Sequence, residues 1–293
     1  MTAPAGLPTS LALARLRTRD DVHLDGVFAE PSRRSKTALV WVHGLGSVFS
    51  SGQPLIRELS VRLTRARIGY FKFNTRGHDV VAGRGRALAG AAFERFRDCV
   101  LDLRAVIAFA RRRGYRRIIL AGHSTGANKV LYYAAKTADR RVTGLILLGP
   151  ISDIAGEAKR IGRRELERRV ARASRLAARD RRALVPRAWG FWSAPRYLSL
   201  YRPGGAEDVF PYDRPGARWT ALRAIRAPLA VMVGGRDEFL DRPPEALIEA
   251  FAAQAARAES FTGRIIPGAL HGFQGREAAV ARAVGEWIRD RCL

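Results

Sequence analysis

Cysteine, histidine and long apolar runs are scarce in this 293-residue sequence, and each shortage excludes a class of protein. Two cysteines, Cys99 and Cys292, cannot build a disulfide framework. The five histidines lie far apart, without the close His or Cys pairs of a metal site, so we expect no metal and no cofactor. No apolar stretch approaches the ~20 residues of a membrane-spanning helix, and residues 1–6 lack the basic start of a signal peptide. These absences predict a soluble, cytoplasmic protein.

Acidic residues are also scarce, because 27 of them face 52 basic ones and leave a formal net charge of +25. Such a charge attracts nucleic acid, membrane surfaces or acidic substrates. The alternative interpretation is that arginine takes the place of lysine on solvated faces throughout the chain. Only residues 159–187 concentrate the arginines, so we favour the second interpretation and expect no specific nucleic-acid partner.

The stretch 118–135 carries the most informative motif in the sequence. An apolar run of strand length ends in Gly122-His123-Ser124-Thr125-Gly126, and a helical pattern follows at once. A serine in such a strand-turn-helix is held in strained backbone geometry, and the two glycines allow the helix and the strand to pack closely. Its hydroxyl is expected at the carboxyl edge of a sheet, beside the free N–H groups of the helix. This context favours a catalytic nucleophile over a structural turn serine.

Strands and helices alternate through most of the chain. An N-terminal hairpin is predicted over residues 12–29 with turn residues at Asp20-Asp21 and Asp25-Gly26, and residues 80–90 are predicted to form a loop. The alternation predicts a doubly wound, mainly parallel sheet, whose ligand site lies beyond the carboxyl ends of the strands. The predicted strands are 37–42, 68–73, 118–122, 143–148, 227–233 and 263–266, and the predicted helices are 52–66, 93–113, 127–135, 243–258 and 277–291.

Residues 154–220 interrupt this alternation. Residues 155–182 form a strongly basic helical stretch, and residues 189–201 hold aromatics and prolines too densely for a regular element. Long excursions of this kind often carry binding or lid functions. We therefore interpret 154–220 as a cap inserted into a core made of residues 1–153 and 221–293.

A nucleophilic serine needs a base, and the base needs a carboxylate that fixes its tautomer. His271 follows the last predicted strand, and Asp237 follows the strand before it. Alone, each would be interpreted as a loop or N-cap residue. Together with Ser124 they stand in the chain order Ser, Asp, His at three strand ends, which predicts a catalytic triad. Weaker alternatives for the acid are Glu238, Asp241 and Asp153.

An oxyanion also needs two hydrogen-bond donors. The backbone N–H of Thr125 is one candidate, and that of Leu45 in the loop His43-Gly44-Leu45-Gly46 is the other. We interpret His43 as a brace for this loop and His123 as a residue packed beside the elbow. Arg76 is interpreted as a donor to loop carbonyls rather than as a catalytic group.

These motifs together resemble the α/β-hydrolase superfamily over essentially the whole chain. The resemblance implies an α/β-hydrolase fold with Ser124, Asp237 and His271 as nucleophile, acid and base. Some features are similar to a branch that includes fungal siderophore esterases, although residues 155–187 hold more arginine than that branch leads us to expect. The features are Gly122 to Gly126, Gly149-Pro150-Ile151-Ser152-Asp153, Ser193 to Tyr201 and Gly205 to Phe210.

The sequence thus predicts a cofactor-independent serine hydrolase that cleaves carboxylic esters through an acyl-enzyme. Alternatives are an acyltransferase, a cofactor-free haloperoxidase, or a non-catalytic module that binds a polyanion through a basic cap. A dehalogenase or epoxide hydrolase is disfavoured, because those reactions call for a carboxylate in place of Ser124. The expected partner is a small-molecule ester, and the sequence leaves its acyl chain and a possible homodimer open.

Overall fold

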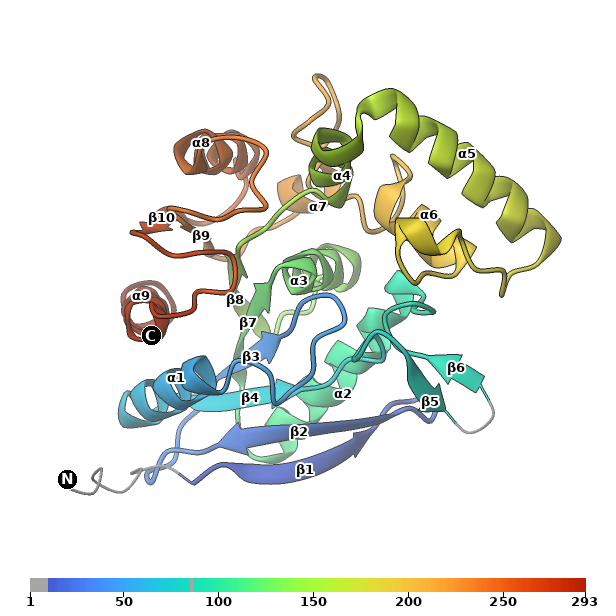
Figure 1. Ribbon diagram of the computed structural model, residues 1–293. Coiled ribbons are helices and arrows are strands. Elements are labelled where there is room, and N and C mark those ends of the chain that lie inside the picture. Colours follow the sequence, from blue (N-terminus) through green and yellow to red (C-terminus); the bar gives the residue numbers. More distant parts are fainter. Residues whose placement is uncertain (1–9, 85–86) are drawn as a thin grey trace, which may run out of the picture.

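The computed structural model describes residues 10–84 and 87–293, so the opening residues 1–6 lie outside it. One eight-stranded sheet has the order β1-β2-β4-β3-β7-β8-β9-β10 (Figure 1). Strand β2 runs antiparallel to both of its neighbours, β1 and β4, and the remaining neighbours are parallel, which confirms the predicted mainly parallel, doubly wound sheet. The strands are β1 (Ala12–Arg17), β2 (His23–Ala29), β3 (Thr37–Val42), β4 (Gly69–Phe73), β7 (Arg117–His123), β8 (Val142–Leu148), β9 (Leu229–Gly234) and β10 (Phe261–Ile266).

Helices cover both faces of the sheet, and four of them lie in the segment between β8 and β9 (Figure 1). None of the helices in residues 10–84 and 87–293 combines the length and the apolarity needed to cross a bilayer. The α-helices are α1 (Gln53–Arg65), α2 (Cys99–Arg112), α3 (Thr125–Thr137), α4 (Asp153–Ile161), α5 (Arg163–Arg179), α6 (Ala194–Tyr201), α7 (Thr220–Arg223), α8 (Pro244–Gln254) and α9 (Glu277–Cys292), and short 3-10 turns span Phe96–Asp98 and Arg187–Trp189.

The central strands are mostly apolar because both of their faces are buried. In β3, Val40 belongs to the core formed with α2, α3 and α8, whereas Leu39 and Trp41 belong to the core formed with α1 and α9. This two-sided burial explains the uninterrupted apolar runs in the sequence. It also fixes the carboxyl ends of β3, β7, β8, β9 and β10 along one edge, where the loops that carry the candidate site begin.

Two predicted loops contain regular structure instead. Residues 80–90 include an antiparallel ribbon of β5 (Ala82–Arg84) and β6 (Ala87–Ala89), which the Gly- and Ala-rich sequence does not indicate. Residues 189–201 end in helix α6. The Ser193 hydroxyl caps the N-terminus of this helix, and a proline lies in its first turn. That proline is compatible with a helix, because an N–H in the first turn has no intrahelical partner.

Two other predictions were wrong about where a helix or a turn lies. The predicted basic helix 155–182 is two helices, α4 and α5, separated at Gly162, whose positive φ of 85° ends the first of them. The N-terminal hairpin turns within residues 18–22, with the Asp21 backbone at φ 62°. Asp25 and Gly26 are therefore not turn residues but part of β2.

A buried cluster of charges joins the segment between β8 and β9 to the rest of the molecule. Lys129 of α3 contacts Glu94 with Nζ and Oε1 2.6 Å apart, and Arg196 of α6 contacts both Glu94 and Glu207. All four side chains are at most 1% exposed. Burial alone would raise the pKa of Glu94, but the charges of Lys129 and Arg196 hold it below its ordinary value. Removing one member would leave an uncompensated charge in the interior.

Replacing Arg196 tests whether this cluster holds the fold together. Arg196→Met should lower the free energy of unfolding by about 3–5 kcal/mol, because Glu94 and Glu207 lose the cation that faces them. The matched control, Arg202→Met, changes an exposed arginine just beyond the same helix and should stay within about 0.5 kcal/mol. Urea unfolding followed by tryptophan fluorescence measures both values. Equal effects of the two substitutions would contradict the assigned role of the cluster.

Candidate active site

Ser124 lies between β7 and α3 in a backbone conformation that non-glycine residues rarely adopt, with φ 56° and ψ −128°. The two glycines of the motif make this turn possible. A Cβ on Gly122 would lie 2.2 Å from the carbonyl oxygen of Gly126, and a Cβ on Gly126 would lie 2.3 Å from that of Val42. Strain at a site over-determined by its surroundings is typical of functional residues. The Ser124 side chain is half-buried at the carboxyl edge of the sheet.

His271 and Asp237 meet at the same edge. The His271 Nδ1 and the Asp237 Oδ2 are 2.8 Å apart, and the carboxylate of Asp237 is completely buried. Its other oxygen, Oδ1, accepts the backbone N–H of Phe239 at 3.0 Å. With an ionised carboxylate as partner, His271 carries its proton on Nδ1 and keeps the Nε2 lone pair free to accept another.

The loop that carries His271 is held against the serine turn by several contacts. The His123 Nε2–H donates to the carbonyl of His271 at 2.8 Å, and the centroids of the two rings are 5.1 Å apart. Gly149, which follows β8, lies behind the pair, and a Cβ there would be 3.0 Å from His271 Cε1. Within the described part of the chain, no hydrogen bond joins Ser124 Oγ to His271. Such bonds often form only when substrate is bound.

The His43 to Gly46 loop lies directly on the serine turn. A Cβ on Gly44 would be 3.0 Å from Ser124 Cβ and 3.5 Å from its Oγ, so any side chain at this position would crowd the serine. Leu45 is the next residue, and Thr125 begins α3 on the other side of the serine. Neither backbone N–H donates a hydrogen bond to another of the described residues. Thr125 directly follows Ser124, Leu45 directly follows the Gly44 that packs on it, and neither predicted oxyanion donor has an internal acceptor among the described residues.

His43 braces this loop, as predicted. Its Nε2 accepts the backbone N–H of Thr75 at 3.0 Å, and its Nδ1–H donates to the carbonyl of Gly44 at 2.9 Å. Burial, together with the nearby charge of Lys129, lowers the pKa of His43 to about 3. A neutral ring is the form that can accept from one neighbour and donate to the other. For the same main reason, burial lowers the pKa of His123 to about 4.

The alternative acids have other surroundings. Glu238 Oε2 accepts the backbone N–H of His271 at 2.9 Å, so it positions the loop rather than the ring. Asp241 forms an ion pair with Arg242. Asp153 follows β8 at the start of α4, where burial and then the charge of Glu207 raise its pKa to about 7. In the described residues, only Asp237 hydrogen-bonds to the imidazole of His271.

The sequence did not predict the contacts that three residues make around His271. Gly149 supports the ring from behind, and Glu238 holds its backbone N–H. The third is Phe239, which is 54% exposed and meets the His271 ring edge to face at 4.8 Å. Their signals in the sequence were a Gly-Pro directly after an apolar strand and two residues directly after Asp237, none of which specifies a contact by itself.

The prediction that Arg76 donates to loop carbonyls is wrong. Its guanidinium binds carboxylates, not loop carbonyls: Nη1 contacts Asp20 at 2.9 Å, and Nη2 contacts Asp102 at 2.9 Å. The Arg76 backbone N–H also donates to Asp102. This planar, bidentate pairing connects the hairpin turn and α2 to the loop after β4. Arg76 is therefore a structural link below the site.

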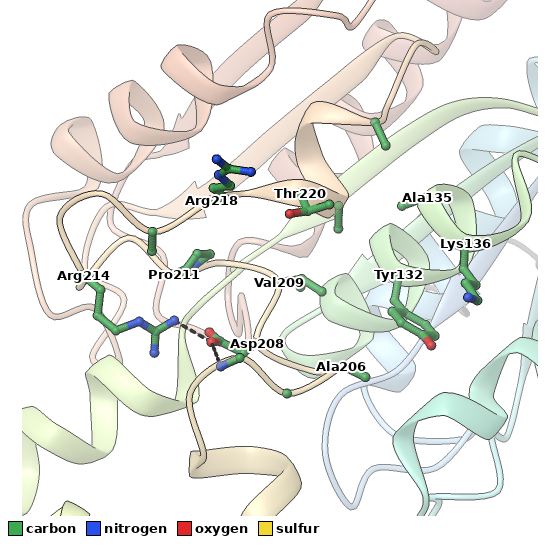
Figure 2. Close-up of a pocket in the computed structure, with 15 residues that line it drawn as sticks. Tyr132, Ala135, Lys136, Ala206, Asp208, Val209, Pro211, Arg214, Arg218 and Thr220 are labelled. Carbon is green, nitrogen blue, oxygen red and sulfur yellow. Dashed lines mark hydrogen bonds and ion pairs between the residues drawn. The ribbon is translucent and has the colours of Figure 1, made fainter.

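A cleft of about 510 Å³ opens between α3, residues 204–218 and α7, as Figure 2 shows. Tyr132 and Lys136 come from α3 on one side, and Arg214 approaches from the other to pair with Asp208. None of the three candidate catalytic side chains lines this cleft. This cleft therefore does not mark the candidate catalytic residues, whose polar groups converge at the sheet edge instead.

The neutral state of His43 predicts an acid-sensitive fold. Below pH 6.5 the unfolded chain protonates this ring, whereas the folded chain does so only near pH 3, so stability present above pH 6.5 is lost as the pH falls. His43→Gln should make the decrease in unfolding free energy between ~pH 6.5 and ~pH 4.5 smaller by about 2–3 kcal/mol. Urea titrations at each pH measure it. His23→Gln, on an exposed face, is the control, and an identical decrease in both variants would refute the assignment.

Several solved structures of distant sequence share this architecture. The siderophore hydrolase EstB of Aspergillus fumigatus is 19% identical with a TM-score of 0.71, and 98% of each chain is covered. A soluble variant of the monoglyceride lipase of Saccharomyces cerevisiae is 15% identical with a TM-score of 0.67 over 99% of each chain. The Pyrococcus furiosus esterase Pf2001 is 17% identical with a TM-score of 0.62, over 97% of this chain and 92% of the esterase.

At these identities the similarity shows the fold, which is the α/β-hydrolase fold. No curated protein matches the chain in sequence. A family model described as "Protein of unknown function (DUF1749)" matches residues 22–289, which is most of the chain. The chain therefore belongs to the DUF1749 family.

Proposed function

We propose that this protein is a serine hydrolase that cleaves carboxylic esters through an acyl-enzyme, with Ser124, His271 and Asp237 as its triad. The observation that carries the proposal is the 2.8 Å contact between His271 Nδ1 and the buried Asp237 carboxylate, beside a serine held at φ 56°. This arrangement supplies an oriented base next to a strained, half-buried hydroxyl. The structural neighbours named as an esterase, a siderophore hydrolase and a lipase support an ester as the bond that is cleaved.

In the first half of the reaction, Ser124 Oγ attacks the carbonyl carbon while His271 Nε2 accepts the hydroxyl proton. The developing oxyanion takes hydrogen bonds from the backbone N–H groups of Leu45 and Thr125, which have no acceptor among the residues that the structure describes. When the bond to the leaving alcohol breaks, the imidazolium of His271 returns the proton to the alkoxide. The acyl group remains on Ser124.

In the second half, His271 accepts a proton from water, whose oxygen attacks the acyl carbon. The bond to Ser124 then breaks, the serine regains its proton and the carboxylic acid leaves. Asp237 stays ionised throughout and stabilises the imidazolium. His123 remains uncharged beside His271, because burial lowers its pKa to about 4, so it does not repel the imidazolium at neutral pH.

Residues 154–220 serve as a cap in this proposal, on a core made of residues 1–153 and 221–293. Their helices α4 to α6 follow the end of β8 and leave the sheet on the side of its carboxyl ends (Figure 1). A cover of this kind would exclude water from the acyl-enzyme and shape the space for the substrate. The exposed ring of Phe239 stands beside His271 and would contact the alcohol or acyl group as it enters.

Ser124→Ala removes the nucleophile and tests the central proposal. The variant should lose hydrolysis of p-nitrophenyl esters by a factor of at least ~10³, along with covalent labelling by a fluorophosphonate. Ser50→Ala, which changes an exposed serine of a neighbouring loop, should keep both. Mass spectrometry of the labelled protein locates the adduct. Equal turnover by the Ser124→Ala variant and the wild type would refute the mechanism.

Gly149→Ala tests whether the ring of His271 needs its present position. The added methyl would lie 3.0 Å from Cε1 at a positive φ of 52°, so it should displace the imidazole and lower kcat about 100-fold while KM changes little. Gly156→Ala in α4 adds a methyl with no atom within 4 Å and should leave kcat unchanged. Ester hydrolysis measures both variants, and circular dichroism confirms folding. An unchanged kcat in Gly149→Ala would contradict this packing role.

A further inference from the structure

The arginines of the chain are most concentrated in residues 163–187, which contain ten arginines and three acidic residues. Helix α5 supplies most of them and runs along the outside of the molecule, with α6 between it and the sheet (Figure 1). The proposed ester chemistry uses none of these residues. So many like charges close together repel one another, and a partner of opposite charge would relieve this repulsion.

Five of the arginines form one straight row. Arg164, Arg168, Arg172, Arg175 and Arg179 are spaced by three or four positions and all are exposed, so they share one face of α5. At 1.5 Å per residue the row is roughly 22 Å long. The opposite face of the helix carries Leu166 and Ala173, which are buried. We call the five arginines the arginine row.

Few of these charges are neutralised by the protein itself. Arg168 pairs with Glu165, and Arg172 lies over the ring of Trp189 at 5.4 Å. In the described ranges, no ion pair involves Arg164, Arg175 or Arg179. Three further exposed arginines continue the basic surface beyond the end of α5, at positions 181, 182 and 187.

Two large apolar side chains are exposed at the same end of the helix. Leu184 is 44% exposed and Phe191 is 46% exposed, and both line one shallow hollow of the surface. They are presented by a narrow loop, which is closed by a hydrogen bond from the Val185 N–H to the Trp192 carbonyl at 3.0 Å. Leaving both in water is unfavourable unless this surface meets an apolar environment.

We propose that the arginine row, with Leu184 and Phe191, docks on a bilayer that contains anionic phospholipids. A guanidinium group can donate two hydrogen bonds to one lipid phosphate. Five such groups along one face of a helix can all contact a flat surface at the same time. The two apolar side chains would enter the boundary between head groups and acyl chains. Single-stranded nucleic acids are bound by stacking of bases on aromatic rings, a contact that the aliphatic Leu184 cannot make. The charge and the exposed apolar pair point to the same partner independently of the proposed ester hydrolysis.

Sedimentation with lipid vesicles tests this docking. The full-length protein should bind vesicles of phosphatidylglycerol and phosphatidylcholine at least ~10-fold more tightly than vesicles of phosphatidylcholine alone, and ~0.5 M KCl should weaken the binding. A triple variant, Arg164→Gln, Arg175→Gln and Arg179→Gln, should lose most of this preference. A control with the same loss of charge, Arg111→Gln, Arg112→Gln and Arg116→Gln, changes exposed arginines at the end of α2 and should keep it.

A second variant separates the apolar anchor from the charge. Leu184→Ser with Phe191→Ser should reduce binding several-fold and remove whatever binding persists at high salt. Equal losses in the two arginine triples would overturn the proposal, because binding would then follow total charge. So would binding to a DNA duplex that exceeds binding to anionic vesicles, or an unchanged affinity after loss of both apolar side chains. All the substituted side chains are exposed in the protein, so the variants should fold, and thermal unfolding checks this for each of them.

Discussion

The buried contact between Lys129 and Glu94 is the constraint on which the rest of the structure depends. Lys129 belongs to the helix that begins beside Ser124, and its ammonium also donates to the Thr75 hydroxyl at 3.1 Å. The Thr75 backbone N–H in turn holds His43, whose loop packs on the serine. A cation sealed in the interior cannot leave its partners without a large cost in free energy. The same contact therefore fixes the helix and, through Thr75 and His43, the loop of the proposed oxyanion site.

The electrostatics of the site follow from burial as much as from pairing. His43 and His123 are both kept neutral by burial, although each lies close to groups that carry charge. His271 is different, because the buried carboxylate of Asp237 lies within hydrogen-bonding distance of its Nδ1. Of these three imidazoles, only His271 hydrogen-bonds to a carboxylate among the described residues. This difference is what a general base requires, since a second cation nearby would make the imidazolium of His271 harder to form.

The sequence predicted the sheet well because the sheet depends on local signals, and signals of the same kind point to the residues of the candidate site. Apolar runs mark strands buried on two faces, and Gly-x-Ser-x-Gly specifies a turn that only glycines permit. The charged cluster left no such signal. Arginine and glutamate usually lie at the surface. The burial of Arg196 and Glu94 depends on the ion pair between them, and they are more than 100 positions apart in the sequence. Helix α6 was missed for a related reason, because its aromatic residues pack against α5 and each other rather than following a simple amphipathic pattern.

The segment between β8 and β9 is anchored unequally along its length. At α6, Arg196 is completely buried between Glu94 and Glu207, so moving this helix away would expose or unpair three charges at once. At α5, few side chains are buried, and Gly162 joins it to α4 in open space where a side chain would meet nothing within 4 Å. If the proposed cap moves to admit a substrate, these buried charges hold α6 in place, and a shift of α5 away from it would have to separate Ala173 from Tyr197. The part of the segment nearest the charged cluster is thus the most strongly anchored, whereas the arginine row on the outer helix is exposed and takes no part in that cluster.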